Sequence, residues 1–149
     1  MDRVRAAICC FFVVLLLIFK PMTVFAYEDI EGEIIEGQKS LLAVLVMAEA
    51  GNQDLDGKRL VVDVVLNRVK DSRFPNTIEE VIYEDNQFSP VEDGGLDRSM
   101  WTVTPDCFKA VEMEFNGNEL DSGILYFSAG GFSNYGTPAF RHGNHYFSR

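Results

Sequence analysis

The chain has 149 residues, which is enough for one domain but too few for two domains of ordinary size. Apolar residues make up 47% and charged residues 24% of it, a balance that excludes a disordered, collagen-like or coiled-coil protein. The formal net charge of −10 argues against a nucleic-acid-binding protein, because a phosphate backbone requires a basic surface. The composition therefore indicates an acidic globular domain that can bury a core.

Residues 1–26 have the three parts of a secretory signal peptide. Two arginines precede an uninterrupted apolar run over 6–19, which is shorter than the roughly 20 residues that cross a membrane. Val24 and Ala26 then supply the small residues that a signal peptidase requires. We predict cleavage after Ala26, export of the mature chain and no stable membrane insertion after cleavage. An uncleaved membrane anchor is the alternative.

The mature chain begins with an acidic segment over 27–37 that is short of large apolar residues, as is typical of a leader or linker. An apolar run over 41–48 predicts a helix that is buried on all sides, and Gly51 ends it. Apolar positions that recur on one face predict a second helix over 56–70. We assign the single folded domain to residues 38–149.

The elements expected after residue 70 are shorter. Thr77 and Glu80 have the spacing of a capping box, which predicts a short helix that ends near Tyr83. We expect, in chain order, a long functional loop over 85–101, a helix over 104–115, a strand over 124–127, a glycine-rich loop over 130–136 and a partner strand over 144–147. Helices followed by a small antiparallel sheet predict an α+β fold, lysozyme-like in placing a glutamate at the end of a buried helix.

Glu49 is the residue whose predicted surroundings most favour chemistry. It lies at the C-terminal end of the apolar helix, and no other charged residue lies between it and Lys39. Burial disfavours the carboxylate form, and so does the negative end of the helix dipole. Both effects raise the pKa toward the range in which a general acid works near neutral pH. The alternative is a glutamate at a helix end whose side chain turns to solvent.

Several segments resemble the SleB/CwlJ-type cell wall hydrolases. They include Ala48-Glu49-Ala50, Leu66-Asn67-Arg68-Val69, Gln87-Phe88-Ser89-Pro90 and Gly143-Asn144-His145-Tyr146-Phe147, and together they follow the family's order over nearly all of 41–149. The resemblance implies degradation of peptidoglycan, often that of the spore cortex, with Glu49 as the catalytic acid/base. It also implies a glycan-binding cleft, for which the candidate residues are Gln87, Phe88, Ser89, Tyr126 and His145.

The chain departs from this pattern in two places. Several spore-cortex members have Ala-Arg-Gly-Glu where this chain has Ala50-Gly51-Asn52-Gln53, and many have a tryptophan-rich stretch where it has Phe140-Arg141-His142. The sequence therefore leaves open whether the substrate is the vegetative wall or the spore cortex. We expect a monomer that acts on peptidoglycan glycan strands outside the cell, in association with the wall.

Two glycosidic mechanisms remain open. A glycosidase normally needs two carboxylates beside the scissile bond, and Asp93, Asp97 or Asp121 could supply the second. Glu49 alone suffices when the C6 hydroxyl of the muramyl sugar is the nucleophile, as in lytic transglycosylases. The resemblance favours this route, with cleavage between N-acetylmuramic acid and N-acetylglucosamine. Hydrolysis by a muramidase or glucosaminidase is the alternative, and a non-catalytic glycan-binding module is a third interpretation.

Cys107 offers a further alternative, a wall peptidase. It lies in the first turn of a predicted helix, where the dipole favours a thiolate, and His142 or His145 could act as its base. The simpler interpretation is a small buried core residue. We expect no cofactor and no metal, because His142 and His145 are three residues apart on a predicted strand and face opposite sides.

Five aromatic residues could stack on sugar rings. For Trp101 and Phe132 we expect ordinary core packing, whereas Phe88 and Tyr126 are the expected cleft residues and Tyr135 is a further candidate.

Overall fold

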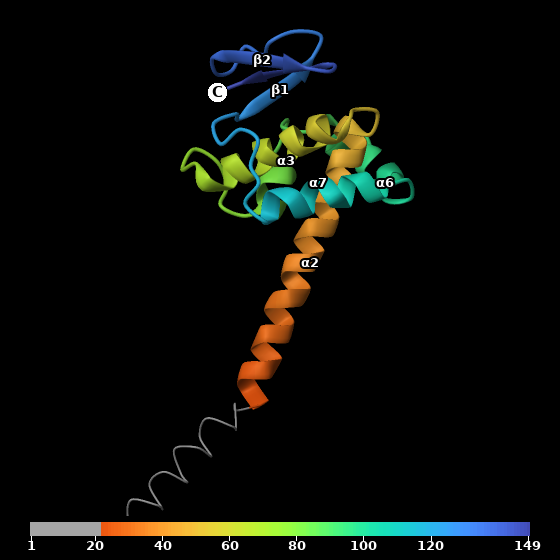
Figure 1. Cartoon of the computed structure of the whole chain (residues 1–149), viewed down its shortest axis with the longest axis vertical. Coiled ribbons are helices and arrows are strands. Elements are labelled where there is room, and N and C mark those ends of the chain that lie inside the picture. Colours follow the sequence, from red (N-terminus) through yellow and green to blue (C-terminus); the bar gives the residue numbers. More distant parts are fainter. Residues whose placement is uncertain (1–21) are drawn as a thin grey trace, which may run out of the picture. The chain divides into compact units, whose positions relative to one another are not determined.

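The computed structural model describes residues 22–149 (Figure 1). The predicted signal peptide therefore lies almost wholly outside the described residues. The chain divides into two compact units, residues 1–36 and residues 37–149, and the described part of the first unit is helical. Within residues 22–149, no helix has both the length and the apolar character needed to cross a membrane.

The first described helix, α2 (Met22–Ala50), is much longer than the apolar run that predicted it. The segment 27–37, expected as a leader or linker, is part of this helix, and its residues 31–37 are exposed. Glutamates are good helix formers, so an acidic composition alone does not distinguish an exposed helix from a linker. Burial follows the apolar run: every side chain from Leu42 to Val46 is buried, as predicted, whereas Leu41, Met47 and Ala48 are half-buried.

Helix α3 (Leu55–Lys70) is the central element of the folded unit, and its bounds match the predicted 56–70. Asp54 caps it by accepting a hydrogen bond of 2.8 Å from the Gly57 amide. Figure 1 shows α3 between helix α7 (Pro105–Phe115) and strand β1 (Tyr126–Ala129).

Because it lies between two layers, α3 is buried on both sides. Its Val61, Val62 and Val65 belong to the core that the helices share. Its Leu60 and Val64 instead pack with Ile124 and Phe147 in a second, smaller cluster that includes residues of the sheet. The valine-rich sequence of α3 is therefore explained by burial rather than by strand formation.

Three short helices connect α3 to α7. They are α4 (Ile78–Ile82), α5 (Ser89–Glu92) and α6 (Gly95–Met100). Thr77 caps α4 by accepting a hydrogen bond of 3.2 Å from the Glu80 amide, as the capping box predicted. The long loop predicted over 85–101 is wrong, because that segment folds into α5 and α6. Each spans two turns or fewer, too short for apolar periodicity to be recognised.

The C-terminal third forms an antiparallel sheet in the order β1-β3-β2, in which β2 spans Pro138–His142 and β3 spans His145–Ser148. Strands β1 and β3 lie within two residues of the strands predicted over 124–127 and 144–147. Strand β2 was not predicted, because most of its residues are exposed and it lacks an alternating apolar pattern. The fold is thus α+β, as predicted, with helices first and a small sheet last.

Polar side chains from the last turns of α3 hold the chain that enters β1. Asn67 Nδ2 donates hydrogen bonds of 2.9 Å to the carbonyl oxygens of Asp121 and Ile124. Arg68 Nε donates one of 2.8 Å to the carbonyl oxygen of Leu125. These three carbonyls precede Tyr126, so the position of that residue is fixed by α3.

A buried carboxyl pair joins α3 to α7. The carboxyl groups of Asp63 and Glu114 lie close together. Burial is the main reason why the pKa of Asp63 rises to about 8, and Glu114 raises it further. Asp63 Oδ2 also accepts hydrogen bonds from the amides of Leu120 and Asp121, at 3.1 and 3.0 Å. Arg59 Nε donates to Glu114 Oε1 at 2.6 Å, so a cation lies beside the two carboxyl groups.

This pair predicts a stability that falls with rising pH. The raised pKa means that the folded state holds a proton that the unfolded state has released, so stability declines between about pH 4 and pH 8, by at most about 1.4 kcal/mol per pH unit for one proton. Asp63→Asn keeps an oxygen that can accept the hydrogen bonds from the Leu120 and Asp121 amides, but its side chain does not titrate in this pH range. We expect urea unfolding at several pH values to show a flatter dependence for Asp63→Asn than for the parent. The same substitution at an exposed position of α7, Asp106→Asn, should keep the parent slope, and equal slopes in all three proteins would contradict the assignment.

Candidate active site

Glu49 lies in the last turn of α2 and is half-buried. Burial raises its pKa to about 7, and the negative charge of Asp93 raises it further as the second cause. The raised pKa was predicted from the sequence, whereas the contribution of Asp93 was not. Near neutral pH, both the protonated and the ionised form of Glu49 are therefore populated, as a group that donates and then accepts a proton requires.

Asp93 lies at the C-terminal end of α5 and faces a hollow of about 300 Å³, here called the Asp93 hollow. Its lining residues are Ala48, Pro90, Asp93, Gly95, Arg98, Ser99 and Thr102. Asp93 Oδ1 accepts a hydrogen bond of 2.7 Å from the Gly95 amide, and Arg98 Nη1 donates one of 3.0 Å to the Asp93 carbonyl oxygen. Because Ala48 precedes Glu49 in α2, this hollow borders the end of that helix.

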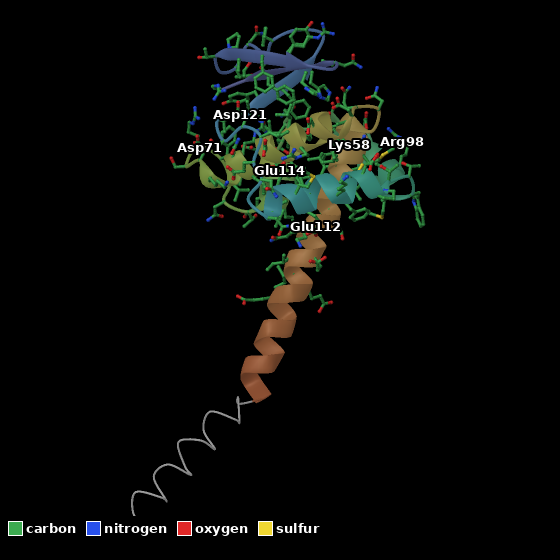
Figure 2. All side chains as sticks on the ribbon, viewed as in Figure 1. Lys58, Asp71, Arg98, Glu112, Glu114 and Asp121 are labelled. Atoms are coloured by element: carbon green, nitrogen blue, oxygen red, sulfur yellow. The ribbon has the colours of Figure 1, made fainter. Side chains whose placement is uncertain are left out.

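Of the three aspartates considered as a second carboxylate, Asp93 is the one whose charge acts on Glu49. Asp121 binds Arg149 at 2.6 Å near the entry to the sheet, and Figure 2 shows it well apart from Arg98, which borders the Asp93 hollow. Asp97 lines a different, apolar hollow on α6. The structure therefore singles out Asp93 among the three.

A second hollow of about 400 Å³, here called the Arg68 pocket, contains two of the predicted substrate-binding residues, Gln87 and Tyr126. Its other lining residues are Arg68, Phe74, Asn86, Phe127, Ser133 and Tyr135. The rings of Tyr126 and Tyr135 are stacked with centroids 6.1 Å apart. The segment from Asn86 to Asp93 lines the Arg68 pocket at its start and the Asp93 hollow at its end, so one short stretch of chain borders both.

The other predicted substrate-binding residues lie elsewhere. Phe88 is only 2% exposed and packs in the core against Phe127, so its ring is not available for stacking on a sugar. His145 is also buried, with its ring 5.0 Å from that of Phe127, and burial lowers its pKa. Ser89 is exposed at the start of α5. Phe88 and His145 thus pack against Phe127, a residue that lines the Arg68 pocket.

Two aromatic residues expected in the core are exposed. Trp101 is 87% exposed and Phe132 is 43% exposed, so the prediction of core packing is wrong for both. Tyr135 is 71% exposed at the rim of the Arg68 pocket. Sequence reasoning assigned no site role to Arg68. The signal that could have revealed it is its spacing of three and four residues from Val65 and Val64, which places a charged side chain on a buried face of α3.

Cys107 is fully buried, as the simpler interpretation predicted. Its Sγ lies 3.4 Å from Thr104 Oγ1 and 3.9 Å from Met47 Sδ, within the core of the helices. A thiol in this position cannot reach a substrate, so the cysteine peptidase alternative is wrong. Within residues 22–149, no group of three or more His, Cys, Asp or Glu side chains is placed to hold a metal ion.

Comparison with known proteins shows the family to which the chain belongs. The chain belongs to the cell wall hydrolase family, whose model matches residues 52–148. The matched range begins three residues after Glu49, so it covers the Arg68 pocket and the Asp93 residue but not the glutamate itself.

Among individual proteins, the chain is similar in sequence to spore cortex-lytic enzymes. The chain is 34% identical over 87 residues to the spore cortex-lytic enzyme of Bacillus cereus, and 33% identical over 88 residues to that of Oceanobacillus iheyensis. These matches cover 58% of this chain but only 32% and 30% of the relatives, so the chain spans about a third of their length.

Solved structures extend the likeness to the fold. The catalytic domain of the germination-specific lytic transglycosylase SleB from Bacillus anthracis superposes with a TM-score of 0.65 at 27% identity, covering 75% of this chain and 93% of that domain. The catalytic domain of the Bacillus cereus SleB protein superposes with a TM-score of 0.67 at 28% identity, covering 76% and 91%.

The influence of Asp93 on Glu49 can be measured directly. In Asp93→Asn we expect the pKa of Glu49 to fall below about 7 but to stay above the ordinary value of 4.5, because burial is the larger cause. A titration of the side-chain carboxyl ¹³C signals by NMR reads this value in the unliganded protein. Asp97→Asn, an exposed carboxylate on neighbouring α6, should leave it unchanged. A Glu49 midpoint near 4.5 in the parent protein would show that the side chain is not buried as described.

Proposed function

We propose that the chain cleaves the glycan strands of peptidoglycan, with Glu49 as general acid and base. The observation that carries this proposal is the half-buried Glu49, whose pKa is raised to about 7 at the end of a buried helix. Membership of the cell wall hydrolase family and the names of the relatives support the substrate class. A non-catalytic glycan-binding module would have no use for a glutamate tuned in this way.

The favoured mechanism is that of a lytic transglycosylase. Protonated Glu49 donates its proton to the oxygen between N-acetylmuramic acid and N-acetylglucosamine as the bond from muramyl C1 to that oxygen breaks. The Glu49 carboxylate then accepts the proton of the muramyl C6 hydroxyl, whose oxygen forms a new bond to C1. The products are a 1,6-anhydromuramyl end and a free 4-hydroxyl, no water is consumed, and Glu49 regains its proton.

Hydrolysis is the second candidate, and Asp93 is the observation that favours it. A two-carboxylate glycosidase needs a second acidic group beside the general acid, and Asp93 is the carboxylate whose negative charge acts on Glu49. In that mechanism a water molecule attacks C1, and a reducing muramyl end forms. The two mechanisms share Glu49 as the acid and differ in the nucleophile.

The remaining proposals concern where the protein acts. The basic, apolar and small-residue parts of residues 1–26 support export, followed by cleavage after Ala26. Residues 38–149 would then act as a secreted, wall-associated monomeric domain. The relatives' names favour the spore cortex as substrate, whereas the departures at Ala50-Gly51-Asn52-Gln53 leave the vegetative wall as the alternative.

Glu49→Gln tests the assignment of the acid. The amide keeps the shape of the side chain but has no acidic proton, so the release of soluble fragments from purified peptidoglycan should fall about 10²–10⁴-fold. Circular dichroism should show an unchanged fold. The matched control is Glu112→Gln, the same substitution at an exposed position of α7 (Figure 2), which should keep full activity. A parent protein that binds the wall but releases no fragments between pH 4 and pH 8 would be a binding module instead.

Product masses separate the two mechanisms. Mass spectrometry of the fragments should show muramyl ends that are lighter by one water than reducing ends, because the C6 hydroxyl replaces water as the nucleophile. In this case Asp93→Asn should change the pH profile without abolishing cleavage. Reducing ends throughout, together with loss of activity in Asp93→Asn, would establish hydrolysis with Asp93 as the second carboxylate.

A further inference from the structure

The Arg68 pocket contains a buried guanidinium group with an unused donor. Arg68 is 4% exposed, and its Nε is already bonded to the carbonyl oxygen of Leu125. Its Nη1 is buried and has no hydrogen-bond partner. An unpaired donor of this kind is costly in a folded protein unless something outside the chain accepts the bond. Among the described residues, none accepts a hydrogen bond from either terminal nitrogen of Arg68, and Arg68 lines the pocket, so a ligand there is the partner that the geometry offers to this guanidinium group.

Aromatic rings surround this guanidinium group. Its Cζ lies 5.0 Å from the ring centroid of Phe74, 5.3 Å from that of Phe88 and 5.5 Å from that of Tyr126. Phe74 and Tyr126 also line the pocket, and Tyr135 extends the aromatic surface of Tyr126 toward solvent. The pocket thus has walls that suit a methyl group or the apolar face of a sugar, with a hydrogen-bond donor held among them.

A carboxylate from the same chain already balances the charge of Arg68. Burial lowers the pKa of Arg68, and the negative charge of Glu84 acts in the opposite direction. Glu84 Oε2 is itself buried and has no hydrogen-bond partner. An unused donor and an unused acceptor therefore lie within electrostatic reach of each other. Glu84 is not among the residues that line the pocket, so its charge offsets that of Arg68 without contacting a ligand there.

We propose that the Arg68 pocket recognises the acetamido group of an N-acetylated sugar, with Arg68 donating a hydrogen bond to the acetyl oxygen. This inference rests on the proposed function, since it names the chemical group by which the glycan is selected. The acetyl methyl group lies against the aromatic walls, the N–H faces the side-chain amides of Asn86 and Gln87, and the sugar ring extends over Tyr135. A de-N-acetylated glycan offers no acetyl oxygen to Arg68 and brings an ammonium group to a pocket whose cation is already paired.

The opposing charge of Glu84 is the reason for choosing an amide over a carboxylate such as the lactyl group of muramic acid. A second carboxylate beside Arg68 would be repelled by Glu84 and, at longer range, by a chain with a net charge of −10. A neutral acetamido group meets neither penalty. The side-chain amides of Asn86 and Gln87 at the pocket provide further donors and acceptors of the same neutral kind.

The test compares two oligosaccharides on the full-length chain in the Glu49→Gln background, where turnover does not interfere. The probes are the tetramer of N-acetylglucosamine and the fully de-N-acetylated tetramer, with binding measured by isothermal titration calorimetry. We expect the acetylated tetramer to bind about tenfold or more tightly, because a hydrogen bond to a buried charged group is gained. Long-range electrostatic attraction favours the de-N-acetylated tetramer, because that tetramer is cationic and the protein is acidic. Tighter binding of the acetylated tetramer would therefore not be an effect of net charge.

Matched substitutions locate the preference. Arg68→Lys keeps the charge but not the planar donors, and it should remove most of the preference for the acetylated tetramer. Arg73→Lys is the control, since Arg73 is exposed, lies 5.9 Å from the same Phe74 ring and is paired with Asp71. If Arg68→Lys fails to fold, Tyr135→Ala provides the second variant, because this exposed ring can be removed without disturbing the core. It should weaken binding of the acetylated tetramer and reduce saturation transfer to its acetyl methyl protons in NMR.

The outcomes separate this inference from the proposed function. Equal binding of the two tetramers, or an acetyl preference that persists in Arg68→Lys, would overturn the recognition of the acetamido group even if the parent degrades peptidoglycan. Conversely, if the parent releases no fragments but shows the Arg68-dependent preference, recognition of the acetamido group would be supported and the proposed cleavage of the glycan would be overturned.

Discussion

The burial of helix α3 on two opposite sides is the constraint on which the rest of the structure depends. A helix between a helical core and a sheet has little surface left for polar side chains, yet α3 carries Asp63, Asn67 and Arg68 on buried faces. Each must find partners within the protein, because an unpaired buried polar group costs more than its hydrogen bond contributes. Their partners are backbone groups of the segment that leads into β1.

This requirement connects the core to the site. Asn67 and Arg68 hold the carbonyl oxygens that precede Tyr126, and Arg68 then lies against the rings of Phe74 and Tyr126. The side chain that anchors the first strand is therefore the same one that lines the pocket beside it. A rigid buried helix thereby positions a surface pocket whose other walls come from loops and the sheet, as a preorganised binding site requires.

The sequence predicted those parts of the fold that have a strong apolar pattern. The buried end of α2 and the whole of α3 follow from the pattern of apolar residues, and the raised pKa of Glu49 follows from its place at the end of the buried helix. Helices α5 and α6 and strand β2 were missed because they are short, or because their residues are mostly exposed. In such segments, contacts with the rest of the chain rather than local pattern decide the structure.

Individual site residues were harder to predict than elements. Trp101 was expected in the core as an ordinary large apolar residue, and Phe88 was expected in the cleft from the family resemblance, whereas in the structure Phe88 is buried and Trp101 is exposed. The two aromatics differ in what surrounds them: Phe88 directly precedes α5 and packs beside Arg68 and Phe127, and Trp101 ends α6 on the outside. Which aromatic is buried depends on the path of the segment over 85–101, and that path was the part of the fold that the sequence did not predict.

Glu49 and Asp63 show that burial alone does not make a carboxyl group catalytic. Burial is the main cause of the raised pKa in both. Asp63 accepts two backbone hydrogen bonds and is paired with Glu114 between α3 and α7, so its proton is held inside the core. Among the described residues, none forms a comparable hydrogen bond to the Glu49 carboxyl group, which lies at a helix end next to a residue that lines a hollow. The difference between a structural and a reactive acid is therefore the absence of fixed partners at an accessible position, because only such a proton can move to a substrate.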